Sequence, residues 1–264
     1  MKNLAIICSL IFLCLVGFYY FVLMPEKYVE NDLYEEIMQR DYIKVGINTE
    51  ARPFGFVGND GSIQGYDADL AHYVAQYLLN NPEKVKFIPV TPSNRMLKAS
   101  TGEVDMVIAT MTITPQREEI LDFSVPYDSA GQSLLVKSTS KITSIGDLGG
   151  QNVGVIWGTT AEKNLLNMAP NANVIGFKSY GDAYKALKSG HINAITSDDT
   201  ILSGFALNDS EVKLLPKRYS REPYGIGFKK GKSTAKLREN VNNAIIDMKQ
   251  KNVINRIHKK WLGK

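Results

Sequence analysis

Short apolar runs alternate with segments of helical periodicity along most of the chain. Runs rich in β-branched residues at 42–48, 84–90 and 104–110 are typical of buried strands. Between them, leucine and valine recur every four residues in a helix for which we expect Asp67 to be the N-cap, and 93–103 predicts a shorter helix. Alternating strands and helices predict an α/β fold whose sheet is covered on both faces.

A second series of the same kind begins after about residue 141. Its expected strands are 152–157, 173–177 and 192–197, and its expected helices are 161–169 and 180–190. Two amphipathic helices follow at the C-terminal end of the chain.

The two series resemble each other around a helix, a glycine and a strand. Aligning Gly102 with Gly190, an offset of 88 residues, places Thr110 opposite Asp198. "KVGIN" likewise resembles "NVGVI", which places Asn48 opposite the last residue of that motif. Any helix–glycine–strand unit has this general pattern. The alternative, which we favour, is two similar lobes that present the carboxyl ends of their strands to a shared cleft, where open α/β sheets bind ligands.

Two segments connect the expected lobes. Residues 130–137 lead out of the first lobe, and 221–230 lead back. We therefore expect a discontinuous lobe 1, residues 41–131 and 225–264, and a continuous lobe 2, residues 132–224. Two chain crossings predict a hinge that closes around a ligand.

The N-terminal segment 1–24 differs from the rest of the chain. Leu4 to Met24 is an uncharged apolar run of 21 residues, and a helix of that length spans about 31 Å, enough for the hydrocarbon core of a bilayer. Bulky Tyr19, Tyr20 and Phe21 stand where a cleavage site needs small residues, so an uncleaved transmembrane anchor is favoured over an atypical signal peptide. Lys2 then keeps the N-terminus in the cytoplasm, and residues 25–40 form a charged tether to an extracytoplasmic remainder, in the periplasm or on the outer face of the cell membrane.

Composition and charge narrow the function classes. The chain has 264 residues, 44% hydrophobic and 22% charged, with a net charge of +4 from 31 basic and 27 acidic residues that are scattered, so nucleic-acid binding is not indicated. Cys8 and Cys14 both lie in the apolar run, which leaves the exported part without disulfides or thiol catalysis. His72, His191 and His258 do not converge in sequence, so we predict neither a metal site nor a catalytic triad.

The stretch "MVIATMTITPQREEILDFSVPY", 106–127, carries the first candidate site. Arg117 offers a planar fork of donors that suits a carboxylate. Thr110 and Thr112 point to the same side of an extended segment, where their hydroxyls can accept from an ammonium group or donate to a carboxylate. The plainer alternatives are a surface ion pair for Arg117 and threonines that only favour a strand.

Two further stretches supply candidate partners. "GTTAE", 158–162, has the spacing of a capping box before a helix, and a helix N-terminus favours an anion. Asp198 or Asp199 is a candidate helix cap, and one of these carboxylates can also bind a cation. Arg117 together with Asp198 would suit a zwitterion such as an α-amino acid. Trp157 is either a core residue or a wall of the cleft.

Five ordered blocks carry a resemblance to a known family. They are "RPFGFVGNDGSIQGYDADLA", "VDMVIATMTITPQREEILDFSVPY", "VGVIWGTTAE", "AITSDDTILSGF" and "EPYGIGFKKG". From about residue 41 to 264 the chain resembles the solute-binding proteins of amino-acid ABC transporters, in the polar-amino-acid subset. The resemblance implies a two-lobed α/β fold like that of periplasmic binding proteins (type II), with a hinge between the lobes. It also implies a monomer that binds a small amino acid without a cofactor and delivers it to an ABC permease.

The resemblance also assigns roles to the candidate residues. Arg117 corresponds to the clamp for the α-carboxylate, helped by the backbone N–H groups of Thr112 and Thr160. Thr110, Thr112 and Asp198 correspond to the site for the α-ammonium group.

Asn48 and Ala51 fall on the loop that surrounds the ligand side chain. Many relatives have an aromatic residue where Ala51 stands, and binders of basic amino acids often have an acidic residue where Asn48 stands. These departures weaken a lysine or arginine assignment and favour glutamine or glutamate, and Arg52 is a candidate partner for an acidic side chain. The expected anchor is a further departure, because family members are usually free in the periplasm or held by lipid.

Two other functions remain open beside the binding module. One is a lyase like cyclohexadienyl dehydratase on the same fold, for which Glu50 is the only candidate general acid on the cleft loop. The other is a ligand-sensing ectodomain. We expect a binding protein and not an enzyme.

Overall fold

The computed structural model describes residues 32–207 and 209–263. The expected anchor, 1–24, and the first part of the expected tether, 25–31, lie outside these residues. Among the residues that the structure describes, no helix is both long and apolar enough to span a membrane.

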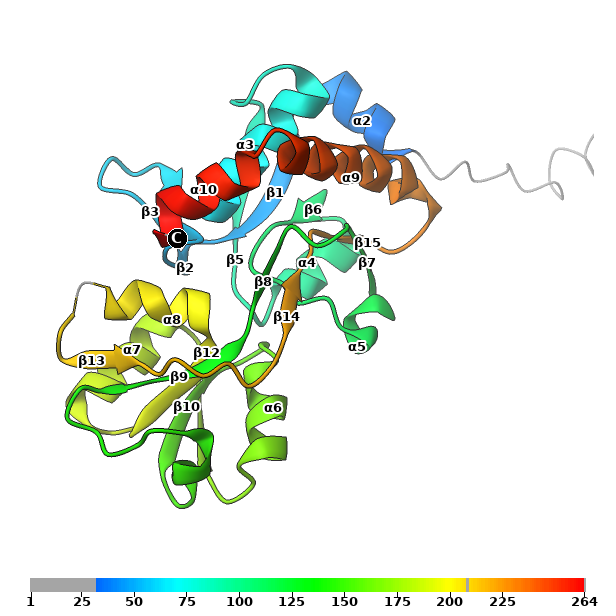
Figure 1. The fold of residues 1–264 in the computed structure, drawn as a ribbon. Helices are drawn as coiled ribbons and strands as arrows, with labels where there is room; N and C mark the ends of the chain where they lie inside the picture. The colour runs from blue at the N-terminus through cyan, green and yellow to red at the C-terminus, as the bar shows by residue number, and fades with distance from the viewer. Residues whose placement is uncertain (1–31, 208, 264) are drawn as a thin grey trace, which may run out of the picture. The chain divides into compact units, whose positions relative to one another are not determined.

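Two five-stranded sheets form the body of the described chain (Figure 1). In the first, the strand order is β5-β1-β6-β15-β7, and we call the part built on it lobe 1. Its strands are β1 (Ile43–Asn48), β5 (Val85–Val90), β6 (Met106–Val107), β7 (Leu121–Phe123) and β15 (Gly227–Lys229). β1 runs parallel to β5 and β6, whereas β15 runs antiparallel to β6 and β7. Parallel strands buried on both faces explain why these segments are almost continuously apolar.

Helices surround the lobe 1 sheet. They are α2 (Leu33–Arg40), α3 (Tyr66–Leu79), α4 (Arg95–Thr101), α5 (Pro115–Glu118), η2 (Lys232–Thr234), α9 (Ala235–Gln250) and α10 (Val253–Leu262). A small three-stranded sheet, β2 (Glu50–Ala51), β3 (Gly55–Val57) and β4 (Ile63–Gln64), lies between β1 and α3 in the chain. The predicted C-terminal amphipathic helices are confirmed: α9 buries Leu237, Val241, Ile245 and Met248 along one face. Burial of one such side chain stabilises the fold by about 1.5–3 kcal/mol.

The second sheet has the order β11-β10-β12-β9-β13, and we call the part built on it lobe 2. Its strands are β9 (Gln132–Lys137), β10 (Asn152–Ile156), β11 (Asn173–Phe177), β12 (Ala194–Asp198) and β13 (Val212–Leu214). Its helices are η1 (Ile145–Leu148), α6 (Ala161–Met168), α7 (Tyr180–Ser189) and α8 (Asp199–Ala206). The sequence pattern predicted β10, α6, β11, α7 and β12 to within a few residues at each end, but not β9, β13 or η1.

The chain passes between the lobes in two paired strands. β8 (Asp128–Ala130) leads into β9 of lobe 2, and β14 (Glu222–Tyr224) leads back toward β15 of lobe 1. The two are antiparallel partners and run side by side in Figure 1, with Tyr224 opposite Asp128. The crossing is therefore a short ribbon held by backbone hydrogen bonds.

The predicted correspondence between the two series is confirmed by strand register. In lobe 1, Met106 and Val107 pair with consecutive residues of β1, and in lobe 2 the positions 88 residues later pair with the equivalent residues of β10. The aligned glycines, Gly102 and Gly190, both end a helix in the left-handed conformation, with φ of 78° and 84°. Each lobe therefore contains the same helix–glycine–strand unit in the same register.

Two local expectations were wrong. Asp67 does not cap α3, because Gly65 is the N-cap and Asp67 is a buried residue of the first turn. The strand expected over 104–110 is only Met106–Val107, since the chain leaves the sheet before Thr110. Residues 33–40 of the expected tether form α2, which packs on α9 with Ile37 fully buried, so they belong to the packing of lobe 1.

Candidate binding site

Arg117 is fixed from its own short helix. The Thr114 hydroxyl accepts the Arg117 N–H at 3.2 Å, and Pro115 supplies the first helical residue of α5, where a missing N–H is tolerated. The side chain is 8% exposed; Nη1 donates to the Thr112 carbonyl at 2.9 Å, and Nη2 donates across to the Gly158 carbonyl of lobe 2 at 3.0 Å. The alternative of a surface ion pair for Arg117 is therefore wrong.

A second buried arginine lies beside it. Arg95, the first residue of α4, is 2% exposed and donates from Nη1 to the carbonyls of Ala109 and Thr110, and its Nε has no hydrogen-bond partner among the described residues. Burial lowers the pKa of both arginines, and for Arg117, which is also near the charge of Arg95, to about 9. Arg117 therefore remains a cation at neutral pH.

Among the described residues, no carboxylate forms an ion pair with either guanidinium group. The arginine ion pairs within the described residues belong to Arg40, Arg218 and Arg238. A buried cation without a counter-ion is expensive, so this part of the molecule favours an anionic partner.

The threonine segment does not continue as an extended strand. Thr110 has a φ of 46°, in the left-handed region that costs a β-branched residue free energy. Its N–H donates to Oδ2 of Asp67 at 3.1 Å, and Oδ1 of Asp67 accepts the Tyr127 hydroxyl at 3.0 Å. Burial raises the pKa of Asp67 to about 7, which the two hydrogen bonds oppose. Thr112 forms an isolated bridge with Tyr224, and both threonines are 4% exposed, so the expected alternation along a strand does not describe them.

Asp198 ends β12 and begins α8. It is the N-cap residue, but its carboxylate makes no cap hydrogen bond; instead Oδ2 accepts the hydroxyl of Tyr224 at 2.5 Å. Burial raises the pKa of Asp198 to about 7, opposed by that hydrogen bond. The nearby Asp198 charge opposes the lowering of the Arg117 pKa that burial and Arg95 cause, so the structure brings the two predicted charges of the site near each other.

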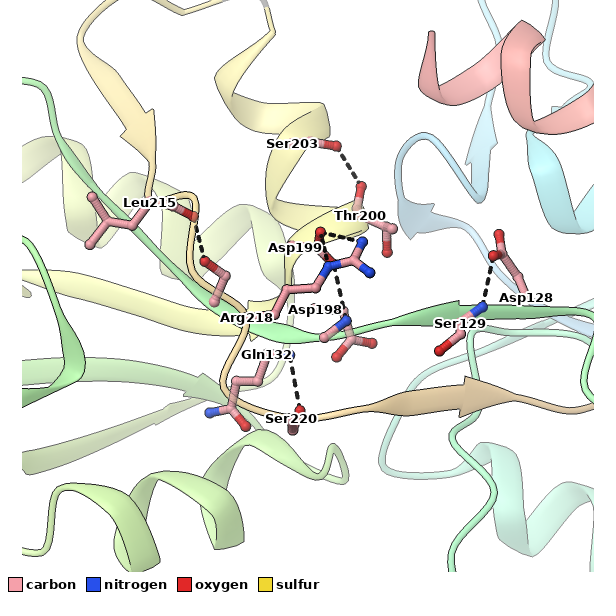
Figure 2. A network of polar contacts seen from close by, with 12 residues as sticks. Asp128, Ser129, Gln132, Asp198, Asp199, Thr200, Ser203, Leu215, Arg218 and Ser220 are labelled. Carbon is pink, nitrogen blue, oxygen red and sulfur yellow. Dashed lines mark hydrogen bonds and ion pairs between the residues drawn. The ribbon is translucent and has the colours of Figure 1, made fainter. Parts of the chain in front are cut away.

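The neighbouring Asp199 has a different task. Its carboxylate accepts the Gly131 N–H at 3.1 Å and Nε of Arg218 at 2.7 Å, as Figure 2 shows beside Asp198. The Asp199 N–H also donates to the Gly131 carbonyl at 2.8 Å. Asp199 thus fastens α8 to the start of β9, where the chain enters lobe 2.

The capping box expected at 158–162 does not form. The Thr159 hydroxyl donates to the Ile156 carbonyl at 2.8 Å, and the N-cap of α6 is Thr160, which makes no side-chain cap bond. The Thr160 hydroxyl donates to Oε2 of Glu222 at 3.0 Å. Glu222 is a buried carboxylate on β14, so this hydrogen bond ties the start of α6 to the strand that leads back to lobe 1.

The remaining predicted residues lie around the end of β1 and of β10. Asn48 is 4% exposed, and its Oδ1 accepts the Glu50 N–H at 2.9 Å. Ala51 is fully buried in the apolar core, whereas Glu50 is exposed. Trp157 is 43% exposed and packs its ring over Gly176, so its interpretation as a core residue is wrong.

An open cleft of about 620 Å³ lies between the lobes. Lobe 1 lines it with Glu50, Arg52, Phe56 and Thr91, and lobe 2 with Lys178, Ser179, Gly181, Asp182, Lys185 and Phe205. The Arg52 guanidinium stands 3.8 Å from the centroid of the Phe56 ring, a cation–π contact that orients it at the cleft.

The sequence analysis missed several buried polar residues. Arg95, Asp67, Tyr127, Tyr224 and Glu222 are each at most 4% exposed and hold the candidate site residues in place. Hydrophobic periodicity does not reveal a buried polar residue, because the pattern treats buried and exposed polar residues alike. Asp67 and Tyr224 do stand inside two of the sequence blocks that carry the family resemblance, which was the available signal.

Comparison with known proteins agrees with this geometry. Residues 43–264 match the bacterial extracellular solute-binding proteins, family 3, and the chain belongs to that family. The chain is 39% identical over 238 residues to the ABC transporter glutamine-binding protein GlnH of Bacillus subtilis (strain 168), covering 89% of this chain and 86% of that protein.

Two solved structures show the same two-lobed fold. An ancestral arginine-binding protein bound to glutamine matches with a TM-score of 0.78 and 36% identity, over 85% of this chain and 99% of that one. The ancestral amino acid-binding protein AncCDT-1, a precursor of cyclohexadienyl dehydratase, matches with a TM-score of 0.80 and 33% identity, over 87% and 99% of the two chains. The predicted periplasmic-binding-protein fold is confirmed.

Proposed function

We propose that this protein is the substrate-binding component of an ABC import system. It binds L-glutamine, or as the second candidate L-glutamate, between its two lobes. Two relatives support a polar amino acid as the ligand: a glutamine-binding protein of an ABC transporter, and an ancestral arginine-binding protein solved with glutamine. The absence of an acidic residue at Asn48 argues against a basic amino acid.

The observation that carries the proposal is the pattern of buried, unmatched charge. Arg117 and Arg95 are buried cations whose hydrogen bonds go to backbone carbonyl oxygens. Asp198 belongs to lobe 2 and is a buried carboxylate. Its side chain accepts a hydrogen bond from the neutral phenol of Tyr224. An α-amino acid carries a carboxylate that suits the two arginines and an ammonium group that suits Asp198. Hydrogen bonds between charged groups are the strong ones in a desolvated site.

The roles of individual residues follow from this pattern. Arg117 clamps the α-carboxylate with help from the N–H groups of Thr112 and Thr160, and Asp198 receives the α-ammonium group with Thr110 and Thr112. Asn48 and the loop that contains Ala51 border the ligand side chain.

Hinge closure is part of the proposed mechanism. The lobes touch where Nη2 of Arg117 meets the Gly158 carbonyl, and the Cα of Gly158 lies so near Pro92 that an added Cβ would be 2.4 Å from its oxygen. A ligand that binds both lobes favours this closed arrangement over an open one. The closed form is then the one that the permease recognises.

The apolar segment Leu4–Met24 completes the proposal. We propose that it holds the protein to the outer face of the membrane, which raises its local concentration near the permease. Fractionation of intact cells tests this: full-length protein that stays with the membrane fraction supports the anchor, and full-length protein found free in the medium or periplasm overturns it.

The central test is thermal unfolding of the full-length protein against the twenty amino acids and prephenate. A ligand at 100 times its dissociation constant adds about 2.7 kcal/mol of stability. We expect glutamine to raise the melting temperature, and Arg117→Met to abolish the rise. Arg238→Met, which removes an arginine from a surface ion pair with Asp122, is the matched control and should respond as the wild type does.

Prephenate distinguishes the lyase alternative. A response to prephenate with turnover, and none to any amino acid, would overturn the proposed function. A response to an amino acid without turnover supports it.

A further inference from the structure

Two buried tyrosines of the crossing ribbon each reach a carboxylate of the binding region. Tyr127 immediately precedes β8, and Tyr224 ends β14. Their backbones are joined, since the Tyr127 N–H donates to the Tyr224 carbonyl at 2.9 Å, and their ring centroids are 6.1 Å apart. At most 2% of either residue is exposed, so this pair is a fixed part of the ribbon.

The two hydroxyl groups point to opposite lobes. The Tyr127 hydroxyl donates to Asp67 of α3 in lobe 1, and the other oxygen of that carboxylate accepts the N–H of Thr110. The Tyr224 hydroxyl donates to Asp198 of lobe 2 at 2.5 Å and lies 3.3 Å from the hydroxyl of Thr200. The ribbon is thus hydrogen-bonded to both residues that the internal alignment places opposite each other. It reaches Asp198 directly, and it reaches Thr110 by way of Asp67.

We propose that Tyr224 and Tyr127 are positioning residues of the ammonium site: Tyr224 orients the Asp198 carboxylate, and Tyr127 orients Asp67, which holds Thr110 in its left-handed conformation. This inference rests on the proposed function, because it takes the cationic group of an amino acid as the partner of Asp198. Both tyrosines act through another residue. The hinge ribbon and the ammonium site are therefore one connected unit.

The chemistry of the contact supports the assignment. A phenol that donates to a carboxylate favours its ionised form, which is the form that accepts from an ammonium group. Tyr224 donates to Oδ2 of Asp198, so Oδ1 can still accept a hydrogen bond from an ammonium group. The charged and titratable groups that act on Asp198 are Tyr224 and Glu222 of β14, Arg95 of α4, Arg117 of α5, Tyr180 of α7 and Asp199 of α8.

The test is isothermal titration of glutamine into the full-length wild type and Tyr224→Phe between pH 6 and 8.5. The substitution keeps the ring and removes only the hydroxyl. A hydrogen bond to a charged group is worth about tenfold or more in an equilibrium constant, so we expect the dissociation constant of Tyr224→Phe at pH 7 to rise by about that factor. Without the phenol, Asp198 holds its proton to higher pH, so the loss should be larger at pH 6 and smaller at pH 8.5.

Tyr127→Phe gives a second measurement with a different signature. It acts through the backbone of Thr110, so we expect weaker binding at every pH without the recovery at pH 8.5 that Tyr224→Phe shows. Two other tyrosine–aspartate hydrogen bonds serve as matched controls: Tyr73 to Asp247 in lobe 1 and Tyr184 to Asp209 in lobe 2. Phenylalanine at either position should leave the glutamine affinity unchanged.

The outcomes separate this inference from the proposed function. A wild type that binds no amino acid overturns both. A wild type that binds glutamine, with Tyr224→Phe unchanged in affinity or weakened equally at every pH, overturns the positioning role of Tyr224 alone. Loss of binding in the two control variants would show a general effect of losing a phenol, and would overturn it as well.

Discussion

Asp198 is a residue whose contribution to stability and to binding should have opposite signs. In the folded protein without ligand, burial raises the pKa of Asp198 from its ordinary 3.8 to about 7. The folded state therefore holds this proton more tightly than the unfolded state. Between about pH 4 and pH 7 the unfolded chain has already lost it, so the stability contributed by this group falls as pH rises through that window and stays low above it.

The substitution Asp198→Asn removes this penalty, and its size follows from the pKa. A rise from 3.8 to about 7 corresponds to about 4 kcal/mol at 1.36 kcal/mol for each tenfold change. We expect Asp198→Asn to gain up to that amount over the wild type at pH 8 and little near pH 4. For a domain of this size the gain would raise the melting temperature by on the order of 10 °C. The amide oxygen of Asn can still accept from Tyr224.

The assay is thermal or urea unfolding of both full-length proteins at pH 4.5, 6 and 8 without ligand. The informative quantity is the growth of the difference with pH, because any pH-independent effect of the substitution cancels. Asp67, whose pKa is also raised to about 7, titrates in the same window but is present in both proteins. A difference that does not grow with pH, or a variant that is less stable than the wild type at pH 8, would refute the reasoning. The same variant should no longer bind glutamine.

Three further predictions follow from the structure. The glutamine affinity of the wild type should fall as pH drops below about 7, since the ligand needs Asp198 ionised; titration calorimetry across pH 5.5–8 would contradict this with a flat profile. Gly204→Ala should weaken binding several-fold, because its Cβ would lie 2.6 Å from the Arg52 oxygen of the other lobe, whereas Gly149→Ala, with no atom within 4 Å, should match the wild type. Asp209→Asn should lower stability at neutral pH and lose that effect as pH falls toward 2, since hydrogen bonds from Lys188 and Tyr184 lower the pKa of Asp209 to about 2; equal pH profiles in urea unfolding would contradict it.

Much of the fold could be predicted because the helices and strands leave a periodic pattern of hydrophobic residues in the sequence. Buried parallel strands such as 173–177 and the amphipathic face of α9 leave strong hydrophobic signals, and the turn glycines at 102 and 190 mark where each helix ends. The alignment of the two lobes came from the same signals. Its register then appeared in the strand pairing, since similar local patterns fold into similar units.

The site was harder to predict because its geometry depends on contacts far apart in sequence. The N–H of Thr110, a residue in the left-handed conformation, donates to Asp67, 43 residues earlier in the chain. The N-cap of α6 is Thr160 and not Thr159, and the Thr160 hydroxyl donates to Glu222, 62 residues further along the chain. Local spacing indicates which residue types stand near a strand end, but it does not indicate which distant side chain will hold them.

The shared register of the two lobes has a consequence for selectivity. The two positions that the sequence alignment places opposite each other, Thr110 and Asp198, carry a neutral hydroxyl and a carboxylate, while Arg117 belongs to the first lobe only. Under the proposed function, a simple carboxylic acid would satisfy one half of the molecule and a simple amine the other. Only a compound that carries both charges at the right separation satisfies the two halves together. Under this proposal the two lobes close only on a ligand that has both groups, because a carboxylate alone or an ammonium group alone binds only one lobe.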